Sequence, residues 1–201
     1  GTGTIDVANI TRVDISAANA TIDINTPITT GDYFRFSIVG SGAACQVNVN
    51  TTLTANNSGG SGNVFRLSSS SGASAGDMNV DMLSGSILDL DGDIQLQNGG
   101  GNLNNTAGVN TTVRYNGGAV TVDPKIVYHN IDIRNTQNLP GDITTTNLLG
   151  DLIIAGSGQL NTNGNNITLG GNLTNSGTLS SGSGSGDIVT LQGSSAQTIS
   201  G

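Results

Sequence analysis

Apolar and polar residues alternate in short runs along most of the chain, and the runs are separated by Gly, Asn and Ser. Ile22 and Ile24 alternate with polar residues, as do Phe34, Phe36 and Ile38. Because successive side chains of a strand point to opposite faces, this pattern predicts strands with one apolar and one polar face. Further strands are predicted at 4–7, 10–16, 64–67, 78–82, 87–97, 112–115, 120–122, 126–133, 148–154, 167–173 and 188–191.

In the second half of the chain the predicted strands recur about every 15 to 25 residues, a typical length for one solenoid coil. The sequence therefore predicts an all-β parallel β-solenoid (β-helix) of roughly nine coils and about 40 to 45 Å. Antiparallel β-sandwich repeats are the alternative, because Asn98-Gly99, Asn116-Gly117 and Asn163-Gly164 are typical hairpin turns. The residues expected inside the solenoid are Ile131, Ile133, Leu152, Ile154, Ile167, Leu169, Ile188 and Leu191.

A loose internal repeat supports the stacked fold. Val-Arg-Tyr-Asn-Gly at 113–117 is similar to Val-Thr-Leu-Gln-Gly at 189–193, and 120–122 is similar to 197–199. Such self-similarity is typical of quasi-one-dimensional architectures. We predict N-terminal coils over 1–97, a Gly/Asn-rich junction over 98–110 and C-terminal coils over 111–201.

Composition narrows the class further. The chain has 31 Gly and six aromatic residues, and its acidic residues are all Asp, so the strong helix former Glu is absent. Hydrophobic residues make up 34 %, enough to order a narrow core of stacked aliphatic side chains. The formal net charge of -8 and scattered Arg residues disfavour nucleic acid. No apolar run reaches the ~20 residues of a membrane-spanning helix.

Three segments of the second half carry a resemblance to a known group. They are Tyr-His-Asn-Ile-Asp-Ile (128–133), Asn-Asn-Ile-Thr-Leu-Gly-Gly-Asn-Leu-Thr-Asn-Ser-Gly-Thr (165–178) and Gly-Ser-Ser-Ala-Gln-Thr-Ile-Ser-Gly (193–201). Residues 126–201 resemble the repeats of large secreted surface proteins of Bacteroidetes bacteria, although Leu173 replaces a frequent Trp and Leu191 a frequent Phe. The resemblance implies an extracellular, adhesin-like or fibre-like β-solenoid, often exported by the type IX route.

Asp89-Leu90-Asp91-Gly92-Asp93 resembles the opening of a calcium loop, because hard cations prefer several oxygen ligands. The twelfth position counted from Asp89 is Gly100, where such a loop needs a bidentate acid. The prediction is therefore a weak calcium site at Asp89, Asp91 and Asp93. The alternative is that these residues keep the solvent face of one strand charged, which opposes edge pairing.

Two catalytic arrangements can be considered from the residue types present, paired Asp carboxylates and a catalytic Cys45–His129 pair. Asp123, Asp132, Asp142 and Asp151 could supply paired carboxylates for glycoside hydrolysis, with Arg134 and Lys125 nearby in sequence. No local pattern ties them together. Cys45 and His129 are the chain's only Cys and His, which excludes an intrachain disulfide and a zinc site built from Cys and His alone. We expect no enzymatic activity and no cofactor other than calcium.

The sequence thus predicts a structural segment of an extracellular bacterial surface adhesin or fibre, acting as a stiff stalk or presentation scaffold. The alternatives are a polysaccharide-binding or polysaccharide-degrading β-helix and an ice-binding surface, the latter because of Thr-x-Thr pairs at 2/4, 52/54 and 144/146. The expected partners are the rest of a longer chain, copies of itself or surface carbohydrate. We expect neither nucleic-acid binding nor membrane insertion.

Overall fold

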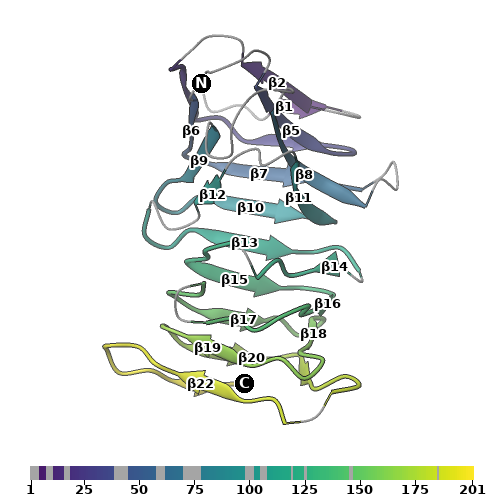
Figure 1. Cartoon of the computed structure of the whole chain (residues 1–201), viewed down its shortest axis with the longest axis vertical. Coiled ribbons are helices and arrows are strands. Elements are labelled where there is room, and N and C mark those ends of the chain that lie inside the picture. Colours follow the sequence, from purple (N-terminus) through teal and green to yellow (C-terminus); the bar gives the residue numbers. More distant parts are fainter. Residues whose placement is uncertain are drawn as a thin grey trace.

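The computed structural model shows a stack of parallel strands wound into a β-solenoid (Figure 1). It describes residues 5–7, 11–15, 19–38, 45–57, 62–69, 78–97, 102–104, 108–118, 120–124, 126–144, 147–184 and 186–201. Every strand pair among these residues is parallel, so the antiparallel sandwich alternative is wrong for the described chain.

One sheet, sheet A, runs the whole length of the stack and forms its first wall. Each coil contributes one of its nine strands, which matches the predicted number of coils. In spatial order they are β1 (Ile5–Val7), β4 (Ile28–Thr30), β7 (Thr52–Ala55), β10 (Ile87–Leu90), β13 (Thr112–Tyr115), β15 (Asn130–Ile133), β17 (Leu152–Ile154), β20 (Leu173–Asn175) and β23 (Ile199–Ser200).

The other two walls change partway along the stack. In the N-terminal coils, sheet B contains β2 (Thr11–Ile15), β5 (Phe34–Ile38), β8 (Asn63–Ser69) and β11 (Asp93–Gln97), and sheet C contains β3 (Thr21–Ile24), β6 (Cys45–Val49), β9 (Met78–Met82) and β12 (Asn102–Asn104). In the C-terminal coils, sheet D contains β14 (Val120–Thr121), β16 (Thr136–Asn138), β18 (Gln159–Asn161) and β21 (Thr178–Ser180), and sheet E contains β19 (Ile167–Leu169) and β22 (Val189–Leu191).

This change of walls falls where the sequence is richest in Gly and Asn. Sheets B and C end with β11 and β12, and sheet D begins with β14, whereas sheet A continues through β10 and β13. The predicted junction at 98–110 thus lies where the cross-section changes. Whether the two parts are separate domains stays a prediction.

Coils differ widely in length although sheet A stays in register. Ile131, Leu152 and Leu173 succeed one another in sheet A at intervals of 21 residues. Thr52 pairs with Ile87, which is 35 residues later, and Thr112 pairs with Asn130 after only 18. The coils therefore stack according to the alternation of inward and outward residues on each strand, and not according to a fixed number of residues per coil.

The internal repeat predicted from the sequence does not correspond to equivalent positions. Its first copy lies on β13 of sheet A, whereas its second copy lies on β22 of sheet E. The shorter match at 120–122 and 197–199 likewise joins β14 of sheet D to β23 of sheet A. Similar strand residues recur on different walls because each wall imposes the same alternation of inward and outward side chains.

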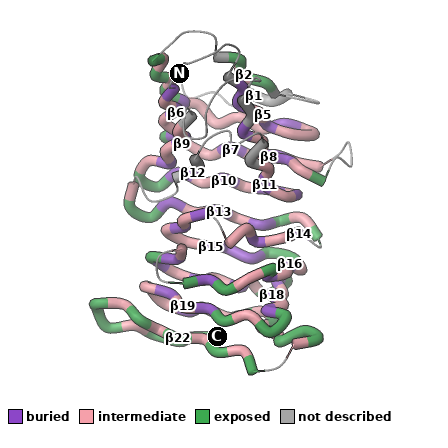
Figure 2. The backbone as a smooth tube through the Cα atoms, viewed as in Figure 1, coloured by how far each residue is buried: buried purple, intermediate pink, exposed green. Residues whose placement is uncertain are grey.

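The core is a set of inward columns along the stack (Figure 2). In the N-terminal coils the rings of Phe34, Phe36 and Phe65 form one cluster, with centroids 4.9 to 6.5 Å apart. In the C-terminal coils the columns are aliphatic and begin with a buried pair, Tyr115 and Tyr128, whose hydroxyl oxygens lie 2.7 Å apart. The solenoid therefore has an aromatic and an aliphatic section.

Most of the residues expected inside are indeed buried, and one is not. Confirmed are Ile131, Ile133, Leu152, Ile154, Ile167 and Leu169. Ile188 is 61 % exposed, so that prediction is wrong; Leu191 is only partly buried. On β22, Val189 and Leu191 pair with the inward Ile167 and Leu169, so the strand's alternation leaves Ile188 outside.

Several predicted strand runs turn corners, among them 87–97, 126–133 and 167–173. The run over 87–97 divides into β10 and β11, with a bend at Asp91 and Gly92, yet Leu88, Leu90 and Ile94 all face inward. The run over 126–133 shortens to β15, preceded by an isolated bridge from Tyr128 to Leu148. Alternation on one face continues around a corner, so it does not mark where a strand ends.

The last coil is the most exposed (Figure 2). Ile199 on β23 is 69 % exposed, and the strands of this coil have a neighbour on one side only in the described structure. Among the described residues there is no helix long and apolar enough to cross a membrane.

Candidate functional site

A column of Asn and Asp (Asx) side chains connects neighbouring C-terminal coils by hydrogen bonds where the strands of sheet A begin. The Oδ1 atom of Asn130 accepts a hydrogen bond from the Asp151 amide at 2.9 Å. Asp151 Oδ1 accepts one from the Asn172 amide at 2.6 Å, and Asn172 Oδ1 accepts one from the Thr198 amide at 2.9 Å. Each side chain thus binds the backbone of the next coil. We call Asn130, Asp151 and Asn172 the Asx column, and we include Thr198 because its amide is the last donor of the series.

Glycine precedes two members of the Asx column because the coils approach closely there. A Cβ atom on Gly150 would lie 2.4 Å from the His129 carbonyl oxygen, and one on Gly171 would lie 2.5 Å from the Gly150 carbonyl carbon. This explains the Gly-Asn-Leu-Thr-Asn segment at 171–175, on which the resemblance to surface repeats rests. Its Gly permits the close approach, its Asn bonds to the next coil and its Leu faces the core.

A second corner of the solenoid has the same arrangement of side-chain oxygen acceptors. Asp142 Oδ1 accepts a hydrogen bond from the Asn166 amide at 2.7 Å, and Asn166 Oδ1 accepts one from the Ile188 amide at 3.0 Å. Both columns use a side-chain oxygen in place of the main-chain carbonyl of the coil before. Corner amides are thereby satisfied without a continuous strand.

Ion pairs line the outer face of sheet A. Arg114 on β13 lies between Asp89 on β10 and Asp132 on β15, with N–O distances of 3.2 and 2.9 Å. The Arg134 Nε atom reaches the same Asp132 Oδ2 atom at 3.0 Å. The Asp132 side chain is only 5 % exposed. We call Asp89, Arg114, Asp132 and Arg134 the charged row; its formal charges cancel.

Asp132 is the shared acceptor of the charged row. One Asp132 oxygen accepts from both guanidinium groups, while Oδ1 is buried with no hydrogen-bond partner among the described residues. A glycosidase needs two carboxylates facing one substrate bond. Here Asp132 lies within the charged row, Asp151 and Asp142 belong to two different corner columns, and Asp123 lies elsewhere. The structure does not bring these four together.

The three Asp residues of the predicted calcium site have different surroundings. Asp89 binds Arg114 and accepts a hydrogen bond from Asn116 Nδ2, and Asp93 accepts one from the Thr121 backbone amide. Asp91 lies at the bend between β10 and β11, where burial, and then the charge of Asp89, raise its pKa. No three acidic, His or Cys side chains of the described residues group as a metal site. Calcium binding stays a prediction that this geometry does not support.

The remaining predicted sites are not assembled within the described chain. Cys45 is buried on β6, whereas His129 precedes β15, whose coil lies four strand positions from that of β6 along sheet A. At ~4.8 Å per strand these residues are roughly 19 Å apart along the stack. Lys125 lies outside the described residues, as do Thr2, Thr4 and Thr146, so of the Thr pairs only Thr52 and Thr54 on β7 are described.

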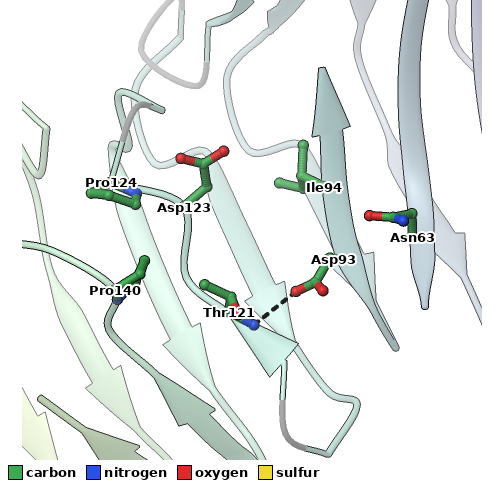
Figure 3. Close-up of a pocket in the computed structure, with 7 residues that line it drawn as sticks. All are labelled: Asn63, Asp93, Ile94, Thr121, Asp123, Pro124 and Pro140. Carbon is green, nitrogen blue, oxygen red and sulfur yellow. Dashed lines mark hydrogen bonds between the residues drawn. The ribbon is translucent and has the colours of Figure 1, made fainter. Parts of the chain in front are cut away.

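A groove opens where the second wall changes from sheet B to sheet D (Figure 3). It has a volume of about 440 Å3 and lies between β11 and the chain that follows β14. The Thr121 amide, which donates to Asp93 Oδ1 at 2.8 Å, joins the two sides. We call this feature the junction groove; it is lined by Asn63, Asp93, Ile94, Thr121, Asp123, Pro124 and Pro140.

The rim of the junction groove is held from inside the solenoid. Tyr128 Oη donates to the Asp123 carbonyl oxygen at 2.9 Å and contacts the Tyr115 hydroxyl. Asn147 Nδ2 donates to the Pro124 carbonyl oxygen at 2.9 Å. Burial raises the pKa values of both tyrosines further above neutral pH. The hydrogen bonds from Tyr128 and Asn147 fix the backbone on one side of the groove.

Sequence reasoning missed the junction groove and the Asx column. The groove joins residues from four separate segments, so no local motif could reveal it. The Asx column left a signal, namely Asx directly before an inward aliphatic residue at Asn130-Ile131, Asp151-Leu152 and Asn172-Leu173.

Comparison with protein-family models, curated proteins and solved structures gave no match.

Proposed function

We propose that this chain is a structural segment of an extracellular bacterial surface protein, where it acts as a stiff stalk or presentation scaffold. The observation that carries the proposal is sheet A, which passes through every coil from β1 to β23 in one unbroken parallel series. Such a sheet holds each coil at a fixed height on the next, and bending the stack would lengthen the hydrogen bonds on one side of it. The inward columns oppose bending in the same way.

Two further observations support this role. The segments that resemble bacterial surface repeats contain Asn130, Asn172 and Thr198 of the Asx column, which supports a role in holding the stack together. The charged row is neutral overall and engaged in ion pairs. Secretion, adhesion and the bacterial source are part of the proposal and rest on the resemblance.

The proposal is tested on intact cells of the source organism. An antibody raised against the folded chain is expected to label unpermeabilised cells, and a protease added outside is expected to remove that label. A cytoplasmic protein provides the control and should resist the protease. Labelling only after permeabilisation would refute the surface location.

Stiffness is tested separately by single-molecule pulling of the chain between two handle domains. We expect the folded chain to keep its length until the first coil detaches and then to unfold in discrete steps, because each coil is held only by its neighbours. Continuous extension without discrete steps would refute the stalk role even if the surface location held.

A further inference from the structure

We propose that the junction groove binds an uncharged pyranose unit of a polysaccharide. The inference does not depend on the stalk proposal, because a stiff solenoid needs no ligand. It starts from the composition of the groove, in which polar and apolar groups are separated as the two kinds of surface of a sugar ring are.

The polar part suits sugar hydroxyls. Asp93 and Asp123 supply carboxylate oxygens, and Asn63 and Thr121 add an amide and a hydroxyl (Figure 3). A carboxylate makes hydrogen bonds to hydroxyl donors that are stronger than those between neutral groups. Asp93 uses Oδ1 for the Thr121 amide and keeps further acceptor positions.

The apolar part suits the C–H face of the ring. Pro124 and Pro140 lie together on one side of the groove (Figure 3), whereas Ile94 faces the core and is only 8 % exposed. Ligand sites typically combine such apolar lining with a few placed polar groups, within a volume of ~300 to 1,000 Å3. The groove, at about 440 Å3, is large enough for one or two sugar units.

Charge decides between sugar classes. The described lining contains two carboxylates and no cationic side chain, in a chain of net charge -8. An acidic sugar would place another carboxylate beside Asp93 and Asp123, where like charges repel. A single metal ion would leave the proline side without a role. An uncharged pyranose uses both parts.

The test is NMR titration of the 15N-labelled full chain with neutral trisaccharides of β-glucan, β-mannan and β-xylan, and with trigalacturonate as the acidic comparison. We expect at least one neutral trisaccharide to shift the Thr121 amide, because that amide donates to Asp93. Trigalacturonate should not shift it.

Two variants sharpen the test. Asp93→Asn keeps an Oδ1 acceptor for Thr121, and Pro140→Ser changes an exposed residue, so both should fold. Each variant is expected to weaken the binding of the neutral trisaccharide at least ~10-fold. Asp23→Asn, the same change on the distant β3, should leave it unaltered. The proposal would be overturned if no neutral trisaccharide shifted the Thr121 amide, or if binding were unchanged in both groove variants. It would also be overturned if the chain preferred trigalacturonate, or a peptide that adds as a strand beside β11.

Discussion

The N-terminal and C-terminal coils hold the same stack together in different ways. Before the junction the walls are long, up to the seven residues of β8, and a cluster of three phenylalanine rings lies among the aliphatic core residues. After it the strands of sheet D have only two or three residues, and Asx columns connect the corners. Wide coils thus depend mainly on filling the core, whereas narrow coils depend more on hydrogen bonds at their corners.

The largest expected effect is in the narrow coils. Ile154 is fully buried between Ile133 and Asn175 on sheet A. Ile154→Asp buries an unpaired carboxylate and should lower the free energy of unfolding by more than ~4 kcal/mol. Hydrogen exchange should show lost protection in the C-terminal coils, while the N-terminal coils stay protected, as in quasi-one-dimensional folds. Ile153→Thr, an outward neighbour, is the control; equal damage from both would contradict the assigned faces.

The next effect concerns the aromatic section. Phe65→Ala should cost about 3 to 5 kcal/mol, because it leaves a cavity beside Phe34 and Phe36, which are held on the neighbouring strand β5. Chemical denaturation measures the loss, and Phe65→Leu should restore part of it. If Phe65→Ala cost less than about 1 kcal/mol, core filling would not distinguish the two halves.

The buried tyrosine pair at the junction predicts a response to alkaline pH. Because the pKa values of Tyr115 and Tyr128 are raised in the folded chain, the unfolded chain releases these protons first. Stability is therefore retained below the unfolded-state value near pH 10 and falls above it. Tyr115→Phe should flatten this fall in a melting series from pH 8 to 11.

At neutral pH, Tyr128→Phe should lower the free energy of unfolding by ~1 to 3 kcal/mol, because Tyr115 and the Asp123 carbonyl lose their partner.

The smallest effect tests what the Asx column needs. Asp151→Asn keeps the Oδ1 acceptor for the Asn172 amide, so stability should change by less than ~0.5 kcal/mol. Asp151→Ala removes that acceptor and should cost about 1 to 2 kcal/mol. Thermal melts of the two variants measure the difference. Equal losses would mean that charge, and not the hydrogen bond, matters at this corner.

The sequence predicted the walls better than the corners. Alternation placed Ile131, Leu152 and Ile167 inside because each side of a strand has one environment. It failed at Ile188, which lies one residue outside a strand, and at the bend after Leu90, where inward alternation continues. Corners depend on the register between coils, and register is not a local property of the chain.

The same limit applies to the candidate site. Asp93 belongs to the predicted calcium motif and Asp123 to the predicted carboxylate set, but nothing local indicates that they share a groove. Their proximity follows because sheet B ends and sheet D begins at one level of the stack. Asp89 and Asp132 were likewise predicted without their common partner Arg114, which lies between them only because β10, β13 and β15 are neighbours.

The variable coil length has a geometric consequence. The coil from Thr52 to Ile87 uses almost twice as many residues as the coil from Thr112 to Asn130, yet both advance the stack by one strand spacing, ~4.8 Å. Height is therefore counted in turns and not in residues. Extra residues widen the molecule sideways, so two features on sheet A keep a fixed separation whatever is inserted at the corners between them.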